Sequence, residues 1–202
     1  MIQPCIWTNF LKLPIEEAVK VFKECGFDCG ELSDEHGKEL LSRGNGEKIG
    51  KELKEYANAL GFSFPQGHLK LNANICEERF EDVTDELKRW LDLFLATGIE
   101  SAVLHSGLIA GKSDDELLEK RCEVLTELAD YIKETNLTIC LENLFRTTFS
   151  CDSLLNIIKN VGSDRLGICL DTGHLNITKA EGQYEFIKKA GSHLKAIHIA
   201  DN

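Results

Sequence analysis

Five short apolar runs in this sequence each end in a side chain that can bind a metal ion. These side chains are His68, His105, Glu142, Asp171 and His198. A short apolar run bounded by polar or turn-forming residues is typical of a buried β-strand. Five such runs at roughly even intervals predict that imidazoles and carboxylates gather at one end of a parallel sheet. In α/β folds, metals and small polar ligands bind at that end.

Strand-like and helix-like segments alternate along the whole chain. We predict strands over residues 4–10, 27–32, 62–68, 101–105, 138–144, 166–171 and 194–199. Between them, apolar residues spaced by three and four predict helix faces. The clearest faces are Ile49/Leu53/Tyr56/Leu60, Phe80/Val83/Leu87/Leu91/Phe94 and Leu118/Cys122/Leu125/Ala129/Ile132. The glycines between helix and strand, Gly26, Gly61 and Gly98, fit helix C-terminal caps, and Ser113 with Glu116 fits a capping box.

Repeated strand–helix units predict an α/β fold with a parallel sheet, either an open doubly wound sheet or a closed (β/α)8 TIM barrel. The first strand–helix junction, residues 7–14, lacks the Gly-x-Gly-x-x-Gly of dinucleotide-binding sheets. Ligand residues at the ends of five strands favour the barrel. We therefore expect residues 1–202 to form a single barrel domain.

The predicted barrel is incomplete, because only seven strands and six helices fit into the 202 residues. A barrel of this type usually takes about 250 residues. We expect an incomplete barrel of about seven strands, with the C-terminal strand–helix unit missing. Our hypothesis is that the sequence is a truncated form of a longer protein.

Composition excludes several classes of function. The net charge is −11 with no basic stripe, which argues against nucleic acid as a partner. The apolar runs are far shorter than the roughly 20 residues of a membrane helix. The eight cysteines form no Cys-x2-Cys pair, and no export signal is visible. These features indicate reduced thiols and a cytoplasmic protein. The sequence leaves open whether identical chains assemble into a homo-oligomer.

Glu142, Asp171 and His198 end three consecutive predicted strands, so their side chains are expected to converge. Two carboxylates and one imidazole suit a divalent cation such as Mn²⁺, Zn²⁺, Co²⁺ or Mg²⁺. Gly173 allows a tight turn after Asp171, which would bring His174 back over the same site.

Other residues are candidates for substrate binding. His68 and His105 end the third and fourth strands and could hold a second cation or a sugar hydroxyl. Arg146 is placed to meet a phosphate or a hydroxyl, or to form a surface ion pair. Trp7 could form an apolar wall for a sugar or pack in the core. His36 lies in a polar segment and is expected to be a solvated loop residue.

These pieces together resemble the xylose-isomerase-like TIM-barrel superfamily, which includes sugar isomerases and epimerases and endonuclease-IV-type enzymes. The matching pieces are residues 67–69 with Asn72, 104–107, 141–143, 170–174 and 197–202. The resemblance implies a metal held by Glu142, Asp171, His198 and a further Glu beyond Asn202. It also implies that Glu142 is one of two catalytic glutamates and that His174 steadies a substrate oxygen. In the endonuclease branch, His68 and His105 would bind additional zinc.

The function expected on these grounds is a divalent-metal-dependent isomerase or epimerase of sugars or sugar phosphates. It would act by proton transfer through an enediolate. With one base and an incomplete metal shell, the 202-residue chain is expected to be inactive or nearly so. One rival hypothesis is a zinc endonuclease that cleaves DNA at abasic sites. Another is a barrel that binds metal or sugar without catalysis.

Overall fold

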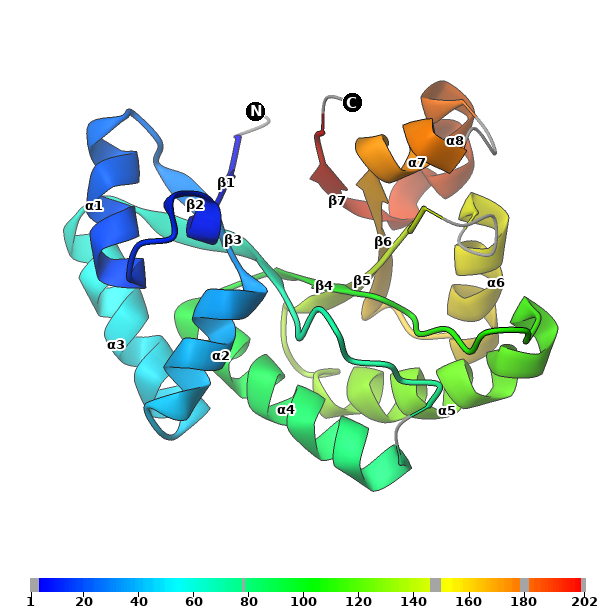
Figure 1. Ribbon diagram of the computed structural model, residues 1–202. Coiled ribbons are helices and arrows are strands. Elements are labelled where there is room, and N and C mark those ends of the chain that lie inside the picture. Colours follow the sequence, from blue (N-terminus) through cyan, green and yellow to red (C-terminus); the bar gives the residue numbers. More distant parts are fainter. Residues whose placement is uncertain (1–3, 78, 146–149, 179–181, 201–202) are drawn as a thin grey trace. The chain divides into compact units, whose positions relative to one another are not determined.

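The computed structural model describes residues 4–77, 79–145, 150–178 and 182–200. Its strands follow one another in the sheet in chain order, from β1 to β7, as in a (β/α)8 barrel (Figure 1). The chain is therefore an α/β protein of the expected class, with seven strands among the residues that the structure describes. It divides into two compact units, unit 1 (Met1–Leu71 with Glu86–Ala102) and unit 2 (Asn72–Asp85 with Val103–Asn202). The expectation of a single domain stays a prediction.

Unit 1 contains three parallel strands and the helices that connect them. Its elements are β1 (Ile6–Trp7), the 3-10 turn η1 (Thr8–Leu11), α1 (Ile15–Glu24), β2 (Cys29–Leu32), α2 (Asp34–Ser42), α3 (Gly46–Ala59) and β3 (Ser63–His68). The register pairs Ile6 with Gly30 and Leu32 with Gly67. The helix α4 (Phe80–Thr97) and the strand β4 (Ser101–Leu104) contain residues of both units.

Unit 2 contains the strands that end in the predicted metal ligands. Its elements are α5 (Asp114–Tyr131), β5 (Thr138–Glu142), α6 (Cys151–Val161), β6 (Leu166–Asp171), α7 (Thr172–Thr178), α8 (Gln183–Ala190), the 3-10 turn η3 (Gly191–His193) and β7 (Leu194–His198). The strand β6 is buried along its whole length. None of the helices among the described residues is long and apolar enough to cross a membrane.

All seven predicted strands are present, and the largest difference is in the first. Residues 4–10 were expected to be extended, but β1 covers only Ile6–Trp7 and the chain then turns into η1. The hydroxyl of Thr8 accepts a hydrogen bond from the Ser33 amide at 2.9 Å and lies 2.9 Å from Nδ1 of His36. Thr8 is thus bound to the segment that follows β2, and β1 ends one residue before it.

The expectation that His36 is a solvated loop residue is wrong. His36 lies in α2, is 5% exposed, and has ring nitrogens 2.9 Å from the Thr8 hydroxyl and 2.8 Å from the Leu13 carbonyl. The hydroxyl of Ser33 accepts from the His36 amide and caps this helix. Because a buried imidazole needs partners for both nitrogens, the contacts explain how a polar segment is drawn into the interior.

The helix ends were predicted well, and one helix face was predicted only in part. Gly26, Gly61 and Gly98 have positive φ angles, as C-terminal caps do, and the capping box of Ser113 and Glu116 is present. In α5, however, the predicted Leu118 and Cys122 are only half-buried. The predicted Leu125, Ala129 and Ile132 are buried, and the buried face also includes Leu117, Arg121, Val124 and Leu128.

The buried face of α5 includes a charged residue, which a search for apolar spacing does not reveal. Arg121 is 1% exposed. Its guanidinium donates to the carbonyls of Ser106 and Gly107 at 3.0 and 2.9 Å and to the Asp114 carboxylate at 2.9 Å. A buried guanidinium is tolerated when its donors are satisfied in this way. Arg121 therefore holds the loop that follows β4 and His105.

We predict that Gly37→Ala destabilises the protein, although alanine favours helix by about 1 kcal/mol over glycine. Gly37 lies in α2 against the buried ring of Trp90, and an added Cβ would come within 2.7 Å of Cη2. Overpacking of this kind costs about 1–3 kcal/mol. Urea unfolding should therefore show a lower free energy of unfolding for Gly37→Ala. The exposed Glu35→Ala in the same helix should change it by about 0.5 kcal/mol or less. A more stable Gly37→Ala protein would contradict the close packing.

Candidate metal centre

The candidate metal ligands of unit 2 are Glu142, Asp171 and His198, and each follows a small, buried residue on the same face of its strand. Strand residues two apart point to the same face, so Cys140 precedes Glu142, Cys169 precedes Asp171 and Ala196 precedes His198 on that face. Together with Val103, these three small residues form one buried core cluster. The parallel register pairs Glu142 with Cys169 and Asp171 with His198. Asp171 and His198 therefore lie side by side just beyond Cys169 and Ala196, and Glu142 lies beside Cys169, at the carboxyl ends of the strands.

Glu142 lies at the centre of this group of polar side chains and is 2% exposed. Its Oε2 lies 3.1 Å from Nε2 of His105, and its Oε1 lies 3.2 Å from Nδ1 of His198. The second carboxylate, that of Asp171, has Oδ2 3.7 Å from the same His198 nitrogen. One ligand atom from each of Glu142, Asp171 and His198 lies within 4.8 Å of the others. This donor set and spacing fit a divalent cation bound by oxygen and nitrogen.

Asn143 aligns the ends of β5 and β6, and the sequence analysis assigned it no role. Its side-chain oxygen accepts from the Asp171 amide at 2.7 Å, and its side-chain nitrogen donates to the Asp171 carbonyl at 2.9 Å. Asn143 is 1% exposed, so this two-point pairing is shielded from water. The Asn143 side chain thus extends the hydrogen bonding between β5 and β6 beyond the last paired residues. It holds the backbone of Asp171, a candidate metal ligand, in place.

His174 lies beside the same two carboxylates, in the first turn of α7. Its amide donates to Oδ1 of Asp171 at 2.7 Å, and its Nδ1 lies 3.0 Å from the Asn143 carbonyl and 3.4 Å from Oε1 of Glu142. The hydrogen bond to the Glu142 carboxylate, assisted by the charge of Asp171, raises the pKa of His174 above its usual value. Phe145 packs edge-on against the ring at 5.7 Å and is 58% exposed.

The predicted site residues are distributed over both units. Unit 2 brings Glu142 and Asp171 together with the imidazoles of His105, His174 and His198. In unit 1, the ring of Trp7 packs edge-on against His68 at 5.9 Å, and Nδ1 of His68 lies 2.8 Å from the Leu69 carbonyl. His68 is 3% exposed. Arg146 lies outside the described residues, so its predicted contact with a phosphate or hydroxyl stays a prediction.

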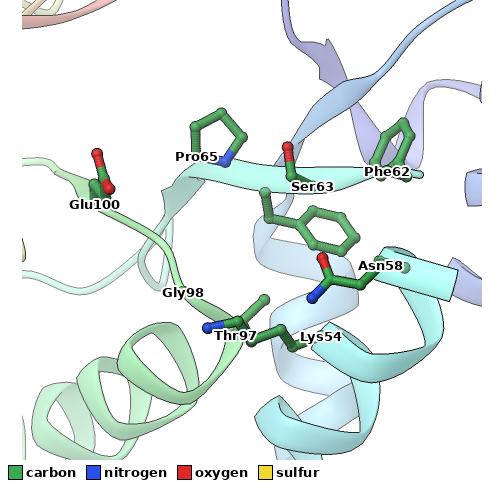
Figure 2. Close-up of a pocket in the computed structure, with 10 residues that line it drawn as sticks. Lys54, Asn58, Phe62, Ser63, Pro65, Thr97, Gly98 and Glu100 are labelled. Atoms are coloured by element: carbon green, nitrogen blue, oxygen red, sulfur yellow. The ribbon is translucent and has the colours of Figure 1, made fainter. Parts of the chain in front are cut away.

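A cavity of about 220 Å³ in unit 1 is separate from these strand ends (Figure 2). Lys54 and Asn58 of α3 line one side of it, and Ser63 and Pro65 line another. Ser63 is the first residue of β3, whereas His68 is the last. The cavity therefore lies at the amino end of this strand, away from the end at which the predicted ligand residues gather.

We predict that Glu142→Gln weakens binding of Mn²⁺ by tenfold or more, because the central carboxylate charge is lost. Asn143→Ala should weaken it by about 10–100-fold, since residues that orient metal ligands have effects of this size. Isothermal titration of the purified chain measures both. Asn156→Ala, at an exposed position of α6, is the matched control and should bind as the wild type does. Equal affinity in wild type and Glu142→Gln would contradict the metal site.

Three comparisons with known proteins agree with this architecture. A family model described as a xylose isomerase-like TIM barrel matches residues 19–202. A probable endonuclease 4 from Oceanobacillus iheyensis is 30% identical over 149 residues, which cover 66% of this chain and 49% of that protein. A D-psicose 3-epimerase from Enterocloster bolteae is 26% identical over 164 residues, which cover 74% of this chain and 54% of that protein. The chain thus spans about half the length of these two curated relatives.

A solved structure of a similar fold is D-psicose 3-epimerase from Clostridium cellulolyticum H10 with D-tagatose. It superimposes with a TM-score of 0.81 over 99% of this chain and 73% of that chain, at 17% sequence identity. At this identity the similarity concerns the fold alone. It confirms the arrangement of strands and helices that the alternating sequence pattern predicted.

Proposed function

We propose that this chain, which belongs to the xylose isomerase-like TIM barrel family, carries the proton-transfer site of a divalent-metal-dependent sugar isomerase or epimerase. The observation that carries the proposal is the buried carboxylate of Glu142, held between imidazoles and next to a second carboxylate. Sugars or sugar phosphates with a carbonyl group are the substrate class. The cytoplasmic location and self-association stay predictions.

Glu142, Asp171 and His198 are the residues that would hold the cation. When bound, a divalent cation supplies Lewis-acid polarisation, which acidifies a C–H bond next to a carbonyl. A carboxylate close to a cation is a weaker base than a free one, so Glu142 suits a carbon acid that is already activated. The buried cluster of Val103, Cys140, Cys169 and Ala196 next to Glu142 limits competing contact with water from that side.

The chain's own residues divide the remaining tasks. Glu142 takes the proton from the carbon next to the carbonyl, leaving an enediolate, and a base on the other face or the same carboxylate returns a proton. His174, whose ring is oriented by the Asn143 carbonyl, hydrogen-bonds a substrate oxygen. The exposed ring of Phe145 beside it offers an apolar surface for the carbon face of a sugar.

A zinc endonuclease acting at abasic sites is the second candidate. The relatives named as probable endonuclease 4 favour it, as do the several histidines among the predicted ligands. The net charge of −11 argues against it, because binding to the DNA backbone depends on basic side chains. We therefore place the sugar enzyme first.

Exchange of substrate hydrogen for solvent deuterium tests the proposal, because it needs only one base. The chain is incubated with Mn²⁺ in D₂O with D-fructose, D-psicose or D-tagatose, and NMR follows the hydrogens next to the carbonyl. We expect exchange above background for at least one sugar. Glu142→Gln should reduce the rate by about 100-fold or more, whereas the exposed Glu119→Gln should not change it.

The rival functions give different results in the same set of assays. A sugar-binding barrel without catalysis would bind Mn²⁺ and show no exchange with any sugar. An endonuclease would show no exchange and would cut a duplex with a single abasic site, with activity lost in Glu142→Gln. Either outcome would contradict the sugar enzyme.

A further inference from the structure

We propose that Cys5 and Cys29 form a redox modification site in unit 1, where they close to an intrachain disulfide that links the start of β1 to β2. The proposal does not rest on the proposed function, because neither thiol belongs to the candidate metal centre. It follows from the strand register, the sulfur–sulfur distance and the exposure of the two residues.

The register places the two cysteines opposite each other. Ile6 pairs with Gly30 in the parallel ladder, and Cys5 and Cys29 are the residues directly before them. Neighbouring parallel strands lie about 4.8 Å apart, and the Cα atoms of a disulfide lie about 4.4–6.8 Å apart. The two Sγ atoms are 3.2 Å apart. Small side-chain rotations are enough to reach the bond length of about 2.05 Å without moving the strands.

The two thiols differ in their access to solvent. Cys5 is exposed, whereas Cys29 is fully buried as the first residue of β2. A small oxidant in solution therefore reaches Cys5 first, and Cys29 is held behind it as the resolving thiol. The residue Cys5 is exposed but its thiol is partly buried against Cys29, and this desolvation raises the pKa of Cys5 to about 12. The thiolate fraction at neutral pH is accordingly small, and oxidation should be slow compared with that of a fully solvated thiol.

The oxidant is a low-molecular-weight disulfide, and the reaction is thiol–disulfide exchange. Cys5 loses its proton to solvent and attacks one sulfur of the oxidant, which releases one small thiolate and leaves a mixed disulfide on Cys5. Cys29 then loses its proton and attacks the Cys5 sulfur, which releases the second small thiolate. The released thiolates take up the two protons. The protein thiols are oxidised by two electrons and the small disulfide is reduced by two.

The link would stabilise a weakly held part of unit 1. The strand β1 contains only Ile6 and Trp7, and Trp7 packs on His68. Cys5 and Cys29 are 24 residues apart, so a bond between them removes loop entropy from the unfolded chain. The oxidised protein should hold β1, and with it the Trp7 ring, more firmly than the reduced protein does.

The test compares the reduced chain with the chain equilibrated in oxidised glutathione. Intact mass should show the loss of two hydrogens, and peptide mapping without reduction should show Cys5 joined to Cys29. The melting temperature should rise by about 5–10 °C, as a disulfide closing a loop of this length predicts. Dithiothreitol should reverse both changes.

Three single variants make the result specific. Cys5→Ser and Cys29→Ala should each abolish the cross-link and the rise in melting temperature, since each removes one sulfur. Cys25→Ser, which removes another exposed thiol, should keep both. Formation of mixed disulfides alone would overturn the proposed site. A Cys5–Cys29 cross-link that leaves the melting temperature unchanged would overturn the proposed stabilisation of β1.

Discussion

The buried charge of Glu142 is the constraint on which the arrangement of unit 2 depends. A carboxylate that is 2% exposed must be compensated by partners, because burial of an unpaired charge costs several kcal/mol. The partners are imidazoles from the end of β4, from α7 and from β7. The strands β4 and β7 and the helix α7 must therefore be placed so that their histidines reach the Glu142 carboxylate. Asn143 contributes to this precision by pairing with the backbone of Asp171.

The buried cluster next to this site explains why its polar groups can come so close together. The cluster consists of the small residues Val103, Cys140, Cys169 and Ala196, which leave room for the longer polar side chains at the strand ends. The loop after β4 is stabilised differently, by the buried guanidinium of Arg121 bound to the Ser106 and Gly107 carbonyls. Hydrogen bonds between buried polar groups thus stabilise the carboxyl ends of the strands, while apolar packing stabilises the residues before them.

Much of the fold could be read from local patterns because the local signals and the tertiary structure agree. The strands β5 and β6 are apolar runs that are buried in the sheet, whereas in β7 only Ala196 is buried. The predicted ends of all three strands lie within two residues of the observed ones. The errors arose where a contact distant in sequence overrides local preference. Thr8 ends β1 by bonding to the segment after β2, and His36 is drawn into the core by Thr8 and Leu13.

The sequence by itself determined which residue types end the strands, because a side-chain period of two and the order of elements are local properties. It thereby indicated Glu142, Asp171, His174 and His198 as one site. Only the tertiary structure decided that Asn143 aligns β5 with β6, that Phe145 packs on His174 and that Arg121 lies on the buried face of α5. These roles depend on which atoms meet across elements, and distances between elements are not encoded in the spacing of residues along the chain.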